Sequence, residues 1–356
     1  MYTKLFHVLR GCFMKKAVAL LPLLLFAGMQ IGCSRAENRL TVAVTIETLS
    51  LFVEAVGSPY VDTVSLVPGG VDPHEFSPDP GTVNKAVSAD LIVVTGHIAW
   101  EGRLLDAAAS RKGLPRNRIG LNLLKDLRGN LTLLYLPREY GGGINLHAFW
   151  LLPDNAVTIS KAIAKKLSTV APSLSPYFEA KAGEFCVKME ELKKLLNGIS
   201  KGHGLAGKRA VIGFPAEQYV AFSLGIETPV ILAGGGEAAG VRPKALEEAY
   251  RGLKSGEYSL IIISDITEKT SIFPFVEELS ETTNSPVAVV KVASFEGMAD
   301  YAALMAYNAG KIAGAASTRR GSGGSRGLEL SLIISSFIFA TIAAVEAVLL
   351  FKGRRR

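Results

Sequence analysis

The chain has 356 residues, of which 49% are hydrophobic and 20% are charged, a balance typical of globular proteins and not of disordered ones. This length exceeds what one hydrophobic core usually serves, so two domains are expected. The formal net charge of +7 comes partly from basic residues near the two ends, so it gives no evidence for nucleic-acid binding.

The chain begins with a segment typical of a secretory signal peptide. Lys15 and Lys16 precede an uninterrupted apolar run over residues 17–29, which is too short for a comfortable membrane span. Small residues permit cleavage nearby, and we interpret residues 1–36 as the signal region. Cys33 lies in a sequence that resembles a weak lipobox, so plain cleavage and lipidation of Cys33 both stay open.

Between the signal region and the C-terminal end, short β-rich runs alternate with amphipathic stretches. Near-continuous runs of Val, Ile and Leu separated by helical segments indicate parallel sheets that are covered on both faces. The predicted strands are residues 40–46, 61–67, 91–95, 209–214, 229–232, 259–264 and 287–292.

One long predicted helix separates these strands into two groups, because apolar side chains in residues 173–200 recur at spacings of three, four or seven. The sequence therefore predicts an α/β protein with two lobes, each a mostly parallel sheet flanked by helices, joined by one long interdomain helix. We place the N-terminal lobe at residues 37–172, the linking helix at 173–203 and the C-terminal lobe at 204–316. Ligands usually bind beyond the carboxyl ends of such strands, so a site between the lobes is expected.

The C-terminal end predicts a membrane anchor. A Gly/Ser/Arg linker at residues 317–329 precedes an almost wholly apolar run at 330–351, which has the length of a single transmembrane helix. The basic tail at 352–356 favours a cytoplasmic C-terminus, which places residues 37–316 outside the membrane.

The first functional signal follows the second predicted strand. Residues 67–76 read Val-Pro-Gly-Gly-Val-Asp-Pro-His-Glu-Phe, and residues 146–153 read Leu-His-Ala-Phe-Trp-Leu-Leu-Pro. With Ala-Asp-Leu-Ile-Val at 89–93 and the segment 301–308, they resemble the zinc- and manganese-binding proteins of ABC importers, the metal-binding receptor lipoproteins. The resemblance covers roughly residues 40–314 and implies a two-lobed binding protein.

The resemblance implies that His74 and His147 are metal ligands from the first lobe. Neutral imidazole is a good ligand for zinc and manganese, and Asp72 or Glu75 could orient or shield it. An isolated histidine is more often structural, but two histidines in matching motif positions favour ligation.

The second lobe departs from the family pattern. The position of the third ligand, a His or Glu in the family, holds Phe214, which cannot coordinate a metal. Glu217 is the first substitute, although a favourable position at a helix N-terminus explains it equally well. Glu296 is the best substitute for the fourth ligand of the family, an aspartate. Further candidates are Asp300, Asp265 and His97, of which His97 follows a predicted strand of the first lobe.

We therefore predict reversible capture of a divalent metal ion, zinc or manganese, by His74, His147, Glu217 and Glu296. The protein is expected to be a monomer in the cell membrane, with its main domain outside, that delivers the ion to an ABC permease. No catalysis and no nucleic-acid partner are expected. The choice between zinc and manganese stays open, because the missing second-lobe ligands are those that would discriminate between them.

Two other functions stay open. An anchored scaffold or adhesin that has lost metal binding would explain Phe214. A metallohydrolase with Glu217 as general base is the second, and the absence of a His-Glu-x-x-His motif from the sequence argues against it.

Overall fold

The computed structural model describes residues 39–69, 71–234 and 240–318. The predicted signal region, transmembrane helix and basic tail lie outside these residues. No helix in the described part of the chain combines the length and the hydrophobicity that a membrane span needs.

Four parallel strands form the first sheet, in the order β2-β1-β3-β4. The strands are β1 (Leu40–Val44), β2 (Val61–Ser65), β3 (Leu91–Val94) and β4 (Gly120–Asn122). All residues of β3 are buried, as expected for an inner strand that is covered on both faces. The sequence prediction missed β4, because its Gly-Leu-Asn sequence contains no run of β-branched residues.

Four further parallel strands form the second sheet, in the order β6-β5-β7-β8. They are β5 (Arg209–Ile212), β6 (Glu227–Ile231), β7 (Leu260–Ser264) and β8 (Val287–Val290). The Leu-Ile-Ile-Ile-Ser sequence of β7 is wholly buried. These two sheets confirm the predicted α/β architecture.

The two sheets share one strand order: in each, the first strand lies between the second and the third. The chain therefore crosses first to one side of the initial strand and then to the other. In open α/β sheets, ligands bind at the carboxyl ends of the strands where this reversal occurs. In the first sheet this place lies beyond β1 and β3, and in the second it lies beyond β5 and β7.

Helices connect the strands and pack on the sheets. The α-helices are α2 (Ser50–Gly57), α3 (Pro80–Ser88), α4 (Glu101–Lys112), α5 (Arg116–Ile119), α6 (Leu123–Leu127), α7 (Pro153–Val170), α8 (Ser175–His203), α9 (Glu217–Ser223), α10 (Pro243–Ser255), α11 (Phe273–Thr283) and α12 (Tyr301–Thr318). Short 3₁₀ helices are η1 (Glu47–Leu49), η2 (Arg128–Asn130), η3 (Arg138–Tyr140), η4 (Phe149–Leu151), η5 (Pro172–Leu174) and η6 (Thr267–Lys269).

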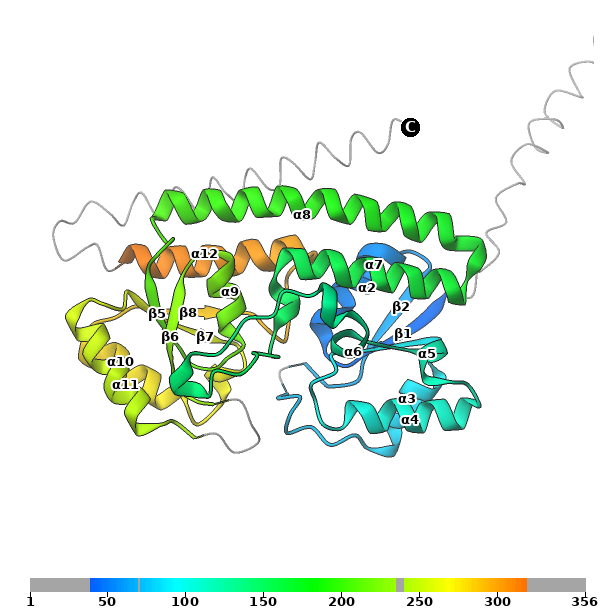
Figure 1. Cartoon of the computed structure of the whole chain (residues 1–356), viewed down its shortest axis with the longest axis horizontal. Helices are drawn as coiled ribbons and strands as arrows, with labels where there is room; N and C mark the ends of the chain where they lie inside the picture. The colour runs from blue at the N-terminus through cyan, green and yellow to red at the C-terminus, as the bar shows by residue number, and fades with distance from the viewer. Residues whose placement is uncertain (1–38, 70, 235–239, 319–356) are drawn as a thin grey trace, which may run out of the picture. The chain divides into compact units, whose positions relative to one another are not determined.

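Helix α8 occupies the place of the predicted linking helix. Its buried side chains include Phe178, Phe185, Met189 and Leu196, which follow the spacing that predicted the helix. It packs against α2 and α7 of the N-terminal lobe and against α12 of the C-terminal lobe, as Figure 1 shows. It ends at His203 and is capped by Gly204, whose left-handed backbone conformation closes the last turn.

One large cluster of buried apolar side chains extends from the first sheet through α8 to the second sheet. It includes Val44 of β1, Phe185 of α8, Ile262 of β7 and Tyr301 of α12. A smaller cluster lies between the first sheet and α4. Because the lobes share one core, their relative position is stabilised by burial of apolar surface as well as by the chain connection.

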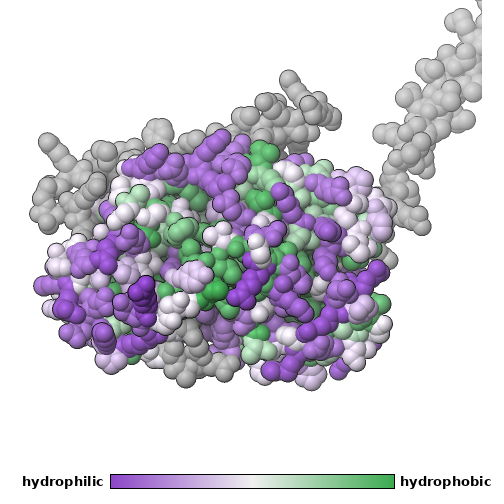
Figure 2. Space-filling model, viewed as in Figure 1, coloured by the Kyte–Doolittle hydropathy of each residue, from purple (hydrophilic) through white to green (hydrophobic). Residues whose placement is uncertain are grey.

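The segment from residue 131 to residue 152, here called the crossing segment, leaves the N-terminal lobe, contacts the C-terminal lobe and returns to α7. The backbone N–H of Leu134 donates to the hydroxyl of Tyr219 at 3.0 Å, and the Tyr301 hydroxyl donates to the carbonyl of Trp150 at 3.0 Å. These hydrogen bonds hold the two lobes together beside the expected site. Figure 2 shows a largely hydrophilic face, with hydrophobic residues gathered near its middle.

Candidate metal centre

Three histidines from separate segments of the N-terminal lobe converge. The ring centroids of His74 and His97 are 5.1 Å apart, those of His74 and His147 are 5.3 Å apart, and those of His97 and His147 are 5.2 Å apart. One nitrogen of each ring lies within 4.8 Å of a nitrogen of both others, so the group could hold a metal ion. The structure thus brings His97 to the two histidines that the sequence motifs identified.

The topology of the first sheet explains why two of these histidines meet. His74 lies in the loop after β2 and His97 lies directly after β3, and these strands flank β1 on opposite sides. Because the strands are parallel, their carboxyl ends lie at the same edge of the sheet. His147 arrives from the crossing segment, just before η4.

The His74 loop is held by the side chain of Asp72 and by a tryptophan. The carboxylate of Asp72 accepts a hydrogen bond from the backbone N–H of His74 at 2.8 Å, and the indole of Trp100 donates to the carbonyl of Pro73 at 3.0 Å. Asp72 therefore shapes the turn, a role that short polar side chains commonly take.

The His97 loop is held by a buried carboxylate. Glu101 is only 1% exposed, and it accepts hydrogen bonds from the backbone N–H groups of Thr95 at 2.7 Å and Gly96 at 2.6 Å. It also accepts from the hydroxyl of Thr45 at 2.6 Å, which joins the ends of β3 and β1. Burial raises the pKa of Glu101, and these hydrogen bonds oppose the rise.

Gly96 has a positive φ of 94°, and a Cβ built on it would lie 2.1 Å from the side-chain oxygen of Asn122. Only glycine fits at this position. The His97 backbone is therefore fixed on both sides, by Gly96 before it and by Glu101 after it.

Burial keeps the imidazoles of His97 and His147 neutral. It lowers the pKa of His147 to about 4, with a further contribution from His74, and it lowers the pKa of His97 well below the usual range, with contributions from His147 and His74. Neutral imidazoles offer the lone pair that a metal needs. The Nδ1 atom of His97 is buried and has no hydrogen-bond partner among the described residues, and coordination of an ion would satisfy it.

The second lobe presents Phe214 to this group. The ring centroids of Phe214 and His147 are 5.3 Å apart with the rings nearly perpendicular, at 79°. The Phe214 ring is thus as close to His147 as the other imidazoles are. The second lobe contributes an apolar ring at the position where the sequence resemblance had implied a ligand.

Glu217, predicted as a ligand, is engaged elsewhere. It is fully buried, and its carboxylate accepts hydrogen bonds from the backbone N–H of Phe214 at 2.6 Å and from the hydroxyl of Thr267 at 2.7 Å. Burial raises the pKa of Glu217 to about 7, although its hydrogen bonds, that from Thr267 foremost, oppose the rise. Like Glu101 in the first lobe, Glu217 joins the loops that follow the first and third strands of its sheet.

The other predicted carboxylates also lie outside the histidine group. Glu296 is exposed. Burial raises the pKa of Glu47, and the negative charge of Glu296 raises this pKa further. Asp265 accepts hydrogen bonds from the backbone N–H groups of Val292 and Ser294, and Asp300 forms an ion pair with Lys188. Within the described residues, the histidine group includes no carboxylate. Ligation by Glu217 and Glu296 stays a prediction, against which the hydrogen bonds of Glu217 argue.

A residue that the sequence motifs did not identify supports His147. Asn145 is fully buried, and its side-chain oxygen accepts a hydrogen bond from the backbone N–H of His147 at 2.9 Å and lies 3.2 Å from Nδ1 of the same ring. The sequence signal was weak, because a single asparagine two residues before a histidine has no distinctive pattern.

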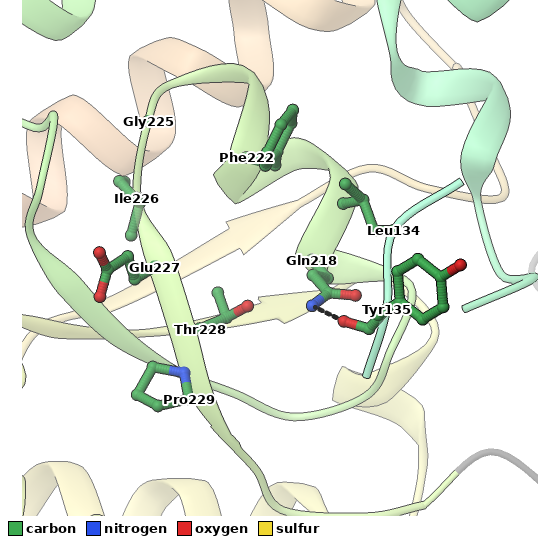
Figure 3. A pocket seen from close by; sticks show the side chains of 9 residues that line it. All are labelled: Leu134, Tyr135, Gln218, Phe222, Gly225, Ile226, Glu227, Thr228 and Pro229. Atoms are coloured by element: carbon green, nitrogen blue, oxygen red, sulfur yellow. Dashed lines mark hydrogen bonds between the residues drawn. The ribbon is translucent and has the colours of Figure 1, made fainter. Parts of the chain in front are cut away.

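A pocket of about 440 Å³ lies beside the free edge of β6, where the crossing segment meets α9 (Figure 3). In Figure 3 the Gln218 side chain points to the Tyr135 backbone, to which it donates a hydrogen bond of 3.0 Å. None of the three histidines lines this pocket. Its lining residues are Leu134, Tyr135, Gln218, Phe222, Gly225, Ile226, Glu227, Thr228 and Pro229.

Comparison with known proteins gives consistent matches over the described lobes. The model of the zinc-uptake complex component A periplasmic family matches residues 42–315. The manganese ABC transporter substrate-binding lipoprotein PsaA of Streptococcus pneumoniae serotype 4 is 26% identical over 320 residues, which cover 84% of this chain and 98% of PsaA. The zinc-binding lipoprotein AdcA of Streptococcus pneumoniae strain R6 is 25% identical over 68% of this chain and 48% of AdcA. The crystal structure of ZnuA aligns with a TM-score of 0.64 at 20% identity, covering 78% of this chain and all of that one.

Proposed function

Because the chain belongs to the zinc-uptake complex component A periplasmic family, we propose that it captures a divalent transition-metal ion and delivers it to an ABC importer. The observation that carries this proposal is the convergence of His74, His97 and His147, whose rings lie 5.1–5.3 Å apart. The ion is cargo, bound reversibly and released to a permease in the membrane.

We place the ligands at these three histidines. All three belong to the N-terminal lobe, so one lobe alone supplies three imidazole nitrogens in place of the predicted combination of histidines and carboxylates. A tetrahedral ion would keep one further position, which faces the apolar ring of Phe214. A water molecule or a small anion can fill that position.

The donor set favours zinc over manganese. Imidazole nitrogens suit zinc, whereas manganese prefers sites rich in carboxylate and water oxygens. The names of the relatives do not decide the question, because PsaA is a manganese protein and AdcA a zinc protein. Zinc is therefore the proposed cargo, because all three proposed protein ligands are imidazole nitrogens.

The proposed location is the outer face of the cell membrane. Two relatives are named lipoproteins, which agrees with attachment at the membrane and with the signal-like N-terminus of this chain. Attachment through Cys33 and attachment through residues 330–351 are both compatible with a permease partner in the same membrane. Protease treatment of intact cells that removes residues 40–318 and spares the basic tail would support this orientation.

Binding is favoured over catalysis by the environment of Glu217. A general base must reach the water that it activates, but both oxygens of the Glu217 carboxylate are held by donors of its own lobe. Phe214 was the best support for the scaffold hypothesis, and the convergence of three imidazoles weighs against a lost site.

The test is zinc and manganese titration of the full-length protein in detergent, with the substitutions His74→Ala, His97→Ala and His147→Ala. A structural zinc site with four protein ligands binds zinc with about 10–16 kcal/mol, so one protein ligand contributes about 3 kcal/mol. Each substitution should therefore weaken zinc binding on the order of 100-fold.

His203→Ala is the matched control, because His203 lies at the end of α8, where its ring contacts the Ser317 hydroxyl, and it is not part of the histidine group. It should bind zinc as the unmodified protein does. Unchanged zinc binding in all three site variants, with the fold intact, would disprove the proposed site. Glu217→Gln and Glu296→Gln decide whether a carboxylate completes the site. If either carboxylate binds the ion, its substitution should weaken zinc binding by about as much as the loss of one histidine.

A further inference from the structure

We infer that Asn145 is a positioning residue that fixes the tautomer of His147 and makes the orientation of this ring depend on the C-terminal lobe. The inference rests on the proposed function, because it assigns His147 as a ligand. It gives the C-terminal lobe a part in metal capture although that lobe contributes no ligand.

The side chain of Asn145 uses its full hydrogen-bonding capacity. Its oxygen accepts from the backbone N–H of His147 at 2.9 Å and lies 3.2 Å from Nδ1 of the imidazole. Its nitrogen donates to the carbonyl of Pro215 and to the side-chain oxygen of Gln218, both at 2.8 Å. The side chain is fully buried, so water does not compete for these bonds.

The partners determine which end of the amide faces the imidazole. The carbonyl of Pro215 can only accept a hydrogen bond, so the NH₂ group of Asn145 must face it. The backbone N–H of His147 can only donate, so the oxygen of Asn145 must face that side. Two independent partners therefore require the same amide orientation.

This orientation sets the position of the proton on His147. The amide oxygen can only accept, so the neutral imidazole must carry its proton on Nδ1. The lone pair is then on Nε2, the atom left free to bind a metal. Without an acceptor at Nδ1, the ring could hold its proton at either nitrogen and could turn about its side-chain bonds.

Three further partners of Asn145 belong to the C-terminal lobe, whereas its backbone N–H donates to the carbonyl of Leu134. Besides Pro215 and Gln218, the Tyr219 hydroxyl donates to the backbone carbonyl of Asn145 at 2.5 Å. Gln218 continues the chain of contacts to the backbone of Tyr135, at the wall of the pocket in Figure 3. A shift of one lobe against the other would therefore move the acceptor that orients His147.

The experiment measures the tautomer and the zinc affinity separately. Nitrogen NMR of the metal-free, full-length protein in detergent, with labelled histidine, reports which ring nitrogen carries the proton. In the unmodified protein we expect His147 to carry it on Nδ1. In Asn145→Ala we expect a mixture of tautomers and zinc binding that is on the order of 10- to 100-fold weaker. Asn145→Asp keeps an acceptor at the ring, so it should keep the Nδ1 proton.

Asn308→Ala is the matched control, because Asn308 is also fully buried and also bonds backbone groups through its side chain, but in the C-terminal lobe at Lys291. It should lose stability without changing the tautomer of His147 or the zinc affinity.

Three results would overturn the inference. The first is a proton on Nε2 of His147 in the unmodified protein, and this measurement needs no variant. Another is loss of the Nδ1 proton in Asn145→Asp. The third is an unchanged tautomer and an unchanged zinc affinity in folded Asn145→Ala. Because the tautomer is read without metal, a failure of zinc binding in the unmodified protein would refute the proposed function and leave the positioning result readable.

Discussion

Replacing Phe214 by histidine should add a second-lobe ligand to the site. The centroid of the Phe214 ring is 5.3 Å from that of His147, a separation within the range of 5.1–5.3 Å found among the three histidines. An imidazole at this position would thus stand at ligand spacing from an existing ligand. The backbone of residue 214 is already fixed, because Glu217 accepts a hydrogen bond from its N–H.

The expected gain follows from what the new imidazole replaces. In the unmodified site, one position of a tetrahedral ion is open to water or a small anion. A fourth protein ligand can add up to about 3 kcal/mol, one quarter of the 10–16 kcal/mol of a structural zinc site. Loss of some apolar contacts of the Phe214 ring reduces this gain, so we expect Phe214→His to bind zinc about 10- to 100-fold more tightly.

Competition titration with a zinc chelator measures this difference in the full-length protein. Phe222→His is the matched control, since Phe222 lies in the same lobe on α9 but is 52% exposed and lines the pocket away from the histidines. It should leave zinc affinity unchanged. If Phe214→His binds zinc no more tightly than the unmodified protein while its fold is intact, the ring of residue 214 does not face the ion and the proposed geometry is wrong.

Two further predictions follow from the residues that support the site. Glu217→Gln should leave zinc affinity within about threefold and should change how stability depends on pH. Burial raises the pKa of Glu217 to about 7, so between about pH 4.5 and 7 the folded chain keeps a proton that the unfolded chain releases. The free energy of unfolding therefore falls as pH rises through this window, by about 3 kcal/mol in total. Denaturant unfolding at pH 5 and pH 7.5 should show this loss in the unmodified protein relative to Glu217→Gln, and equal pH dependence of the two would contradict it. Gly96→Ala should destabilise the fold and weaken zinc binding by displacing His97, because the new Cβ would lie 2.1 Å from the Asn122 oxygen. Gly113→Ala is the control, because Gly113 also has a positive φ but a Cβ there would have no atom within 4 Å. It should cost only the backbone strain of about 1–2 kcal/mol. Thermal unfolding and zinc titration of both variants would show whether the clash at Gly96 matters.

The strands were predictable because the side-chain pattern that a buried strand requires lies within a few adjacent residues. A strand that is buried on both faces needs apolar, mostly β-branched side chains at consecutive positions, and β3 and β7 meet this requirement. The linking helix was predictable for a similar reason, since one face of α8 repeats apolar residues at helical spacing. β4 is so short that its pairing with β3, and not its composition, makes it a strand.

Only part of the candidate site was predictable from the sequence. His74 and His147 were identified by motif, and the structure places their rings together. His97 was only one of several further candidates, because the sequence does not say which strand ends lie side by side. Glu217 was chosen because it is acidic and close in sequence to Phe214, yet its carboxylate serves the backbone of that loop.

The sequence by itself determined the α/β class, the two groups of strands, the linking helix and two of the three histidines, because each depends on residues within one short segment. Only the tertiary structure decided that His97 joins the group, that Glu217 and Glu296 lie outside it, and that Asn145 connects His147 to the other lobe. These outcomes depend on distances between segments that are far apart in the chain, and the order in which the strands pack sets those distances.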